Sequence, residues 1–168
     1  LYDIKTDINI SKDKTILIVE DERNHLQLLE KIIKQLKYKV LCSESAKEAL
    51  AYLNNSRESI DLILVDLIMP DINGLELLQI IKTDNKKHHI PVIMLSAFDE
   101  LDTIIKCIQI GADDFLIKPV NRVFLEARIN SSLEKKMFRD KEKKYQKQIK
   151  VEQEKSDNLL KNILPLSI

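Results

Sequence analysis

Residues 60–71, with the sequence IDLILVDLIMPD, decide the fold of this chain. The apolar run at residues 62–65 has no polar alternation, which predicts a strand buried on both faces of a parallel sheet. Asp66 directly follows this run, at the carboxyl end of the strand, where open α/β sheets bind their ligands. An aspartate in this position also commonly forms a turn, so its role depends on which residues the rest of the chain places beside it.

The rest of the chain alternates short apolar segments with stretches in which apolar residues recur at helical spacing. Such alternation predicts an α/β fold, a doubly wound five-stranded parallel sheet with right-handed crossovers between the strands. The predicted strands are residues 15–19, 40–42, 62–65, 92–95 and 115–117, and the predicted helices are residues 24–36, 46–54, 75–83, 101–110 and a long one from residue 122.

The composition fits one domain with an appendage. Of 168 residues, 44% are hydrophobic and 32% are charged, so a packed core can coexist with a strongly solvated segment. The formal net charge is zero, which gives no general case for binding nucleic acid or a membrane. Because no apolar run could span a bilayer and no leader opens the sequence, we expect a cytoplasmic protein. The first residue is Leu1 rather than Met, and we expect an internal piece of a longer protein.

The last predicted helix continues into a charged segment whose residues follow a heptad pattern. We expect three parts: an N-terminal tail (1–13), a globular domain (14–135) and a signalling helix (136–168). A charged helix can also stay single and solvated, but it is then only marginally stable, and we favour a parallel coiled coil that forms a homodimer. Steps of four and three residues connect the predicted seam, which consists of Phe138, Glu142, Tyr145, Ile149, Glu152, Ser156, Leu159 and Ile163.

Polar side chains stand at the carboxyl ends of four predicted strands. The first strand is followed by Glu20 and Asp21, the third by Asp66, the fourth by Ser96 and the fifth by Lys118. Since parallel strands end at one edge of the sheet, we expect these side chains to converge. Three carboxylates repel one another unless a cation lies among them, and oxygen ligands without histidine or cysteine favour Mg²⁺. The ammonium and hydroxyl groups leave room for a small dianion, so Asp66 is the candidate nucleophile for a phosphoryl group.

Four segments resemble the response-regulator receiver family: ILIVEDE at residues 16–22, VDLIMPDING at 65–74, LSA at 95–97 and LIKP at 116–119. The resemblance covers roughly residues 14–135 and includes every site position in order. It implies a flavodoxin-like receiver fold with strand order 2-1-3-4-5. It also implies that Asp66 accepts a phosphoryl group from a sensor histidine kinase or a phosphotransfer protein.

The resemblance also implies a ligand set for the metal. Asp21 and Asp66 would bind Mg²⁺ together with the backbone carbonyl of Ile68, and Glu20 would hold a metal-bound water molecule. Ile68 and Phe98 are apolar where the family is commonly polar. Both could shield the phosphoryl group from water, and we therefore expect a long-lived phosphorylated state.

Three further residues receive roles from the resemblance. Ser96 would bond to the phosphoryl group, and Lys118 would pair with it. The peptide bond between Lys118 and Pro119 would be cis. Phe115 would be the aromatic switch that fills the space vacated when Ser96 moves.

Two other classes of α/β protein are disfavoured by the sequence. The only glycines are Gly74 and Gly111, so no glycine-rich loop can hold the polyphosphate of a nucleotide. A phosphatase with an aspartyl nucleophile would have a second aspartate at the position of Ile68.

The C-terminal segments FLEARINSSLEKKMFRD (124–140) and EKSDNLLKNILPLSI (154–168) resemble linkers that join receivers to class III nucleotidyl cyclases. The stretch NILPLSI at 162–168 matches an N-x-L-P-x-x-I-like motif before the catalytic domain of that family. The resemblance implies a fragment that is not itself an enzyme, from a parent adenylate or guanylate cyclase. The same residues also fit an amphipathic helix that stops at Pro165. A different output, such as a phosphatase, or a dimerising interaction module stays open.

Overall fold

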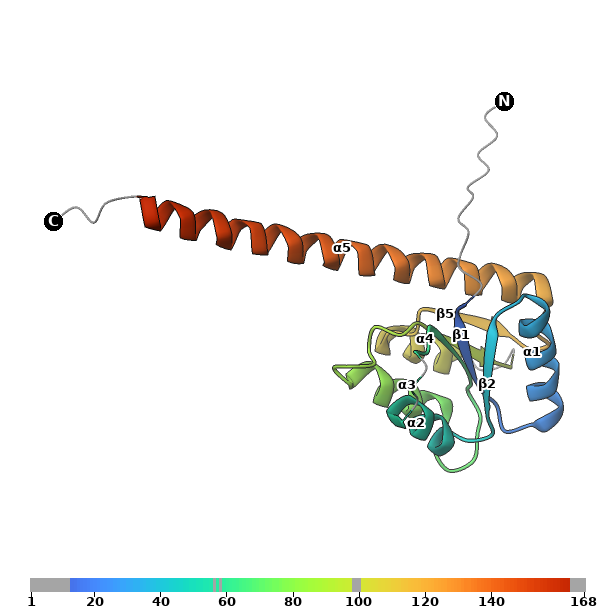
Figure 1. Ribbon diagram of the computed structural model, residues 1–168. Coiled ribbons are helices and arrows are strands. Elements are labelled where there is room, and N and C mark those ends of the chain that lie inside the picture. The colour runs from blue at the N-terminus through green and yellow to red at the C-terminus, as the bar shows by residue number, and fades with distance from the viewer. Residues whose placement is uncertain (1–12, 56, 58, 98–100, 164–168) are drawn as a thin grey trace. The chain divides into compact units, whose positions relative to one another are not determined.

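The described strands form one parallel sheet in the order β2-β1-β3-β4-β5, which confirms the predicted doubly wound fold and strand order (Figure 1). This computed structural model describes residues 13–55, 57, 59–97 and 101–163. β1 pairs with both β2 and β3, so the order of the strands reverses there, and ligands of open α/β sheets bind at such a point. The strands are β1 (Thr15–Val19), β2 (Lys39–Ser43), β3 (Leu62–Asp66), β4 (Val92–Ser96) and β5 (Asp114–Ile117).

Every predicted element is present, although several ends move by a residue. β2 is one residue longer at each end than predicted, because Lys39 and Ser43 pair with Thr15 and Val19 of β1. Backbone pairing does not require apolar side chains, so hydropathy alone underestimates the strand. The helices within the described ranges are α1 (Arg23–Gln35), α2 (Ala46–Asn55), α3 (Gly74–Thr83), α4 (Leu101–Ile110) and α5 (Arg122–Ile163).

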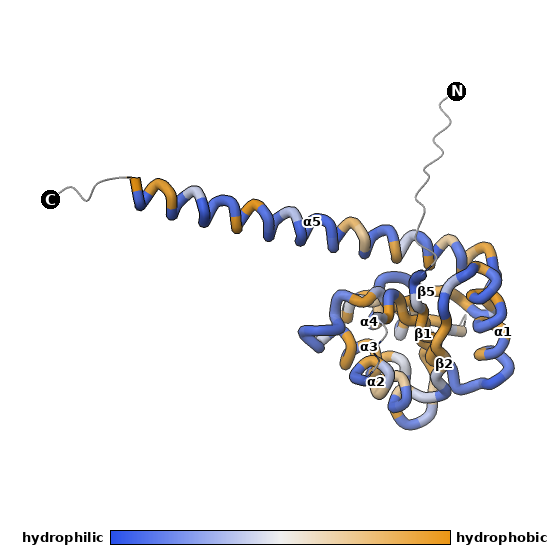
Figure 2. Tube along the Cα trace, viewed as in Figure 1, coloured by the Kyte–Doolittle hydropathy of each residue, from blue (hydrophilic) through white to orange (hydrophobic). Residues whose placement is uncertain are grey.

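The sheet is buried on both faces, as the unbroken apolar run of β3 predicts. Leu62 and Leu64 pack with α1 and the first turns of α5, whereas Ile63 and Val65 pack with α2, α3 and α4. All four side chains are fully buried. Figure 2 shows β1 largely in the orange of hydrophobic residues, whereas the tube of α5 changes repeatedly between orange and blue. The two cores hold the strands rigidly and thereby fix the positions of the residues at the strand ends.

The chain divides into two compact units, Leu1–Glu134 and Lys135–Ile168, and α5 contributes to both. In the first unit Leu125, Ile129 and Leu133 of α5 are buried in the core. In the second unit every described side chain from residue 138 to residue 163 is exposed. The predicted coiled coil needs a second chain and stays a prediction.

Some expectations fall on residues outside the described ranges. These are most of the N-terminal tail, the shielding role of Phe98 and residues 164–168 of the linker motif. Among the helices of the described ranges, none is both long and apolar enough to cross a membrane.

Candidate functional site

The carboxyl ends of three strands bring charged residues together. Glu20 directly follows β1, Asp66 is the last residue of β3, and Lys118 directly follows β5. The Lys118 ammonium donates a hydrogen bond to Glu20 Oε2 at 2.8 Å and lies 3.0 Å from Asp66 Oδ1. Glu20 and Lys118 are 98 positions apart in the sequence. They meet because all strands of the sheet run in the same direction.

Asp21 joins this group through its carboxylate. One oxygen from each of Glu20, Asp21 and Asp66 lies within 4.8 Å of the other two. Glu20 is fully buried and Asp66 is 6% exposed, whereas Asp21 is exposed to solvent. The ammonium of Lys118 pairs with two of these three carboxylates, Glu20 and Asp66, so the cluster keeps an excess of negative charge. Closely spaced carboxylate oxygens are the ligands that Mg²⁺ prefers, so the donor set fits this ion.

The Glu20 side chain is held from two sides. Its Oε1 accepts a hydrogen bond from the backbone N–H of Glu22 at 3.2 Å, and its Oε2 accepts from Lys118. The backbone N–H of Glu20 donates to the carbonyl of Ser43 at 3.1 Å, which anchors the residue to the end of β2. Both carboxylate oxygens of this buried residue are thus satisfied, and its orientation toward Asp66 is fixed.

Burial and charge shift the pKa values of the paired residues. Burial raises the pKa of Asp66 above its usual value, and the negative charge of Glu20 adds to this effect. The hydrogen bond from Lys118 opposes the increase without cancelling it. Burial by itself would lower the pKa of Lys118, but its hydrogen bonds with Glu20 and Asp66 raise the pKa above its usual value. Lys118 is therefore held as a cation beside Asp66.

The turn after β3 returns the chain closely against the backbone of Asp66. A Cβ atom at Gly74 would lie 2.2 Å from the carbonyl oxygen of Asp66, so only glycine fits at the start of α3. The Gly74 N–H donates to the carbonyl of Leu67 at 2.9 Å. A reciprocal capping box of Asn73 and Glu76 fixes the first turn of the helix. The close approach at Gly74 was not predicted from the sequence; the N-x-x-E spacing of Asn73 and Glu76 is the local signal of the helix start.

Ser96 and Phe115 lie on the two neighbouring strands β4 and β5. Ser96 ends β4 and is 1% exposed, and its hydroxyl donates a hydrogen bond to the carbonyl of Ala97 at 3.2 Å. Phe115 pairs in register with Met94, two residues before Ser96, and its half-buried ring packs against the core that faces α2, α3 and α4. The serine is thus placed at the same sheet edge as Asp66, and the ring lies one strand further out.

Two residues next to the charged group complete the predicted set. The side chain of Ile68, two positions after Asp66, is 65% exposed. The peptide bond between Lys118 and Pro119 is cis, as the resemblance implied.

Comparison with known proteins identifies the family. A sequence profile described as the response regulator receiver domain matches residues 16–130, which is more than half of the chain. The chain therefore belongs to the response regulator receiver family of two-component systems. Receiver domains are regulatory domains rather than enzymes, and their partners are histidine kinases or phosphotransfer proteins.

Individual relatives extend this result. The two-component response regulator-like PRR37 of Oryza sativa subsp. indica is 36% identical over 107 residues, which cover 64% of this chain and 14% of that protein. The 3',5'-cyclic-nucleotide phosphodiesterase regA of Dictyostelium discoideum is 34% identical over 153 residues, which cover 88% of this chain and 19% of that protein. The chain thus spans less than a fifth of the length of these relatives.

A solved structure agrees with the assignment. A response regulator receiver domain protein from Clostridium thermocellum superimposes with a TM-score of 0.70 at 30% identity, over 74% of this chain and 98% of that chain. The shared structure therefore covers a complete receiver domain.

Proposed function

We propose that Asp66 accepts a phosphoryl group from a phosphohistidine of a sensor histidine kinase or a phosphotransfer protein. The observation that carries the proposal is the Lys118 ammonium, which lies 3.0 Å from Asp66 Oδ1 within a cluster of three carboxylates. An oxygen of Asp66 attacks the phosphorus in line, and the bond between phosphorus and the imidazole nitrogen breaks. The nitrogen keeps the electron pair, and Asp66 becomes an acyl phosphate.

The acidic residues fit a magnesium ion in this scheme. Asp21 and Asp66 would hold it with the backbone carbonyl of Ile68, and Glu20 would hold a water molecule bound to it. When bound, Mg²⁺ supplies positive charge that neutralises the carboxylates and the incoming phosphoryl oxygens. The fixed orientation of Glu20 keeps a negative charge on the buried side of the site.

Phosphorylation would then change the contacts of three residues. Lys118 pairs with a phosphoryl oxygen instead of the free carboxylate. The Ser96 hydroxyl leaves the carbonyl of Ala97 and bonds to the phosphoryl group, and the Phe115 ring moves toward the vacated space. The exposed side chain of Ile68 limits the access of water, so the acyl phosphate is long-lived.

The signal would pass through α5 to an output domain in a homodimer. The proposed output is a class III adenylate or guanylate cyclase, and its support is the resemblance of residues 124–140 and 154–168 to cyclase linkers. A parallel coiled coil would place two output domains side by side, and subunit interfaces are where these cyclases form their active sites.

A second candidate output has an observation of its own. The match to regA covers 88% of the chain. Even if the match began at residue 1, it would extend beyond residue 130, where the match to the receiver profile ends. The similarity therefore includes part of the helix beyond the receiver domain. This favours a cyclic-nucleotide phosphodiesterase over a phosphatase as the alternative to the cyclase. Assays of the parent protein for both cyclic-nucleotide synthesis and hydrolysis distinguish the two outputs.

The acceptor role can be tested on the chain itself. Incubation with Mg²⁺ and acetyl phosphate should add the mass of one phosphoryl group, and Asp66→Asn should add none. Chelation of the divalent ion should prevent the addition to the unmodified chain. Addition of a phosphoryl group to Asp66→Asn at the normal rate would contradict the assignment.

A further inference from the structure

The second unit presents a seam of eight residues, of which five are apolar or aromatic and three are polar. The helix continues without a break to Ile163, and the seam's apolar and aromatic side chains are exposed by half or more. In a heptad written a to g, Glu142, Ile149, Ser156 and Ile163 occupy a positions, and Phe138, Tyr145, Glu152 and Leu159 occupy d positions. Exposed apolar side chains along a helix are stabilised when another helix covers them.

The charges flanking the seam indicate a second copy of the same chain in parallel register. In that register Glu134 at position g faces Arg139 at position e of the second copy, which is an attractive pair. The next pairs are Lys141 with Gln146, Gln148 with Gln153, and Lys155 with Leu160. Over residues 134–160, then, no flanking pair brings like charges together.

Most lysines of the segment lie on the outer face of such a dimer. Positions b, c and f carry the exposed lysines Lys143, Lys144, Lys147, Lys150 and Lys161. These charges are exposed to solvent, so dissolved salt screens the repulsion between them. They do not face one another across the interface.

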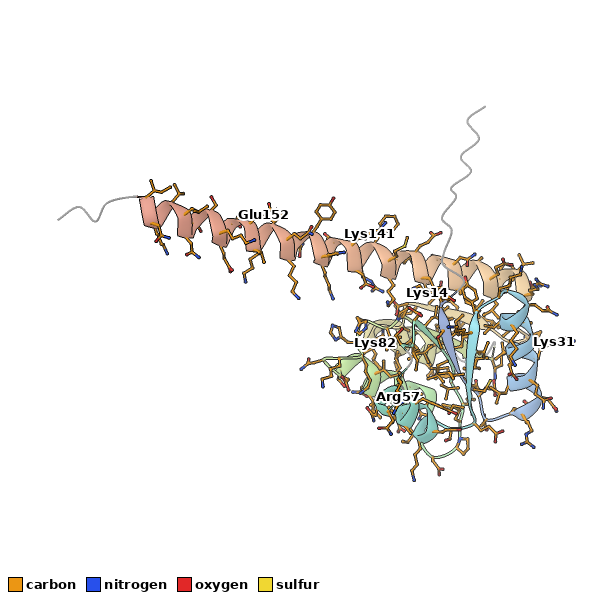
Figure 3. The ribbon with its side chains drawn as sticks, viewed as in Figure 1. Lys14, Lys31, Arg57, Lys82, Lys141 and Glu152 are labelled. Atoms are coloured by element: carbon orange, nitrogen blue, oxygen red, sulfur yellow. The ribbon has the colours of Figure 1, made fainter. Side chains whose placement is uncertain are left out.

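Two core positions nevertheless carry negative charge. In a parallel dimer each core residue faces its own copy, so Glu142 meets Glu142 and Glu152 meets Glu152. Like charges in a partly desolvated layer repel, and both lose contact with water. Figure 3 labels Glu152 and Lys141 on α5.

The two acidic layers are not equivalent. In knobs-into-holes packing an a-position residue contacts the preceding g residue of the other helix, which places Lys141 of the second copy beside Glu142. A d-position residue contacts the following e residue, which places Gln153 beside Glu152. The first layer contains a compensating cation and the second does not, so Glu152 weakens the dimer more.

We infer that Glu152, and to a smaller extent Glu142, keep the self-association of this helix weak, so that the receiver domain can control it. This inference rests on the homodimer of the proposed function and adds the residues that set its strength. A fully apolar seam would hold the dimer together whatever the state of Asp66. With two acidic layers, a small change in free energy at the base of the helix is sufficient to shift the equilibrium between monomer and dimer.

The test is sedimentation equilibrium of the full chain at neutral pH. Glu152→Leu should tighten self-association by about tenfold or more, since apolar replacement of buried charges stabilises by about 1.4 kcal/mol or more. Glu142→Leu should tighten it less. Glu154→Leu makes the same chemical change two residues away, at an outer f position, and should leave the dissociation constant unchanged.

Two outcomes would overturn the inference. One is equal tightening by Glu152→Leu and Glu154→Leu, which would show a general effect of surface hydrophobicity. The other is no change with Glu152→Leu, which would show that residue 152 is not in a seam. Mass addition at Asp66 in the same variants reports the acceptor role separately, because these substitutions lie outside the receiver unit.

Discussion

The two edges of the sheet use aspartate and lysine in opposite ways. At the amino edge Asp61, which precedes β3, pairs with Lys14 at 3.0 Å, and Asp113, which precedes β5, pairs with Lys82 at 2.9 Å (Figure 3 labels both lysines). Each of these carboxylates also accepts the backbone N–H of the first residue of a strand, Thr15 in β1 and Val92 in β4. At the carboxyl edge, three carboxylates lie together and the ammonium of Lys118 pairs with only two of them.

This difference separates an arrangement in which the carboxylate charges are compensated from one in which they are not. At the amino edge each carboxylate has an ammonium and a backbone donor, so its charge is compensated by the fold itself. At the carboxyl edge the fold leaves negative charge that an external cation can neutralise. Local electrostatic destabilisation of this kind is typical of functional sites. Substitutions at the two edges should therefore change the free energy of unfolding in opposite directions.

The largest effect on stability is expected at the amino edge. Asp113→Asn should lower the free energy of unfolding by about 3 kcal/mol, because it leaves the nearly buried Lys82 ammonium without its counter-charge. The amide oxygen of Asn can still accept the hydrogen bond from the Val92 N–H. The loss of stability therefore measures the contribution of the carboxylate charge. Urea denaturation measures the change. An unchanged midpoint would show that the pair is not a stabilising element of this edge.

Gly74→Ala should cost about 2 kcal/mol and should also slow phosphorylation, because the new Cβ forces the α3 start away from the Asp66 carbonyl. Gly111→Ala is the matched control. Gly111 needs its positive φ of 115°, but its nearest neighbours would lie 3.8 Å from a Cβ, so this variant should lose stability without a change in the phosphorylation rate. Equal slowing in both variants would point to a global cause.

Asp66→Asn should stabilise the chain without Mg²⁺ by about 1 kcal/mol at neutral pH, which is opposite to Asp113→Asn. The pKa of Asp66 is raised in the folded state, so the folded chain binds more protons and loses stability as pH rises from the unfolded value of 3.8 through the folded value. The advantage of the variant should therefore be absent below this window and fully developed above it. Urea denaturation at several pH values measures the difference in stability between the variant and the unmodified chain. A difference that does not change with pH would show that the ionisation of Asp66 is not its cause.

An effect of similar size is expected from the ion itself. Mg²⁺ at several times its dissociation constant should stabilise the chain by about 1 kcal/mol, since it binds only the folded state. The increase should disappear in Asp21→Asn and persist in Asp61→Asn, because the latter changes the amino edge. Thermal denaturation with and without the ion checks both variants, and stabilisation of Asp21→Asn would place the ion elsewhere.

The sequence predicted which side chains gather at the carboxyl edge, because each follows an apolar strand. The run 62–65 identified β3, and the direction of the strands placed Glu20, Asp66 and Lys118 at one edge. Strand burial is a local property that hydropathy records directly. The amino-edge pairs escaped prediction, since nothing in the local pattern around Lys82 indicates that Asp113 lies 2.9 Å away.

By itself, then, the sequence determined the order of the elements, the family and the residues that gather at the carboxyl edge. The tertiary structure decided which of them touch: Lys118 bridges Glu20 and Asp66, and Gly74 leaves room for the Asp66 carbonyl. The physical reason is the distance along the sequence over which each effect acts. Propensity and hydropathy act over a few neighbouring residues, whereas a hydrogen bond between positions 20 and 118 exists only after the whole sheet has assembled.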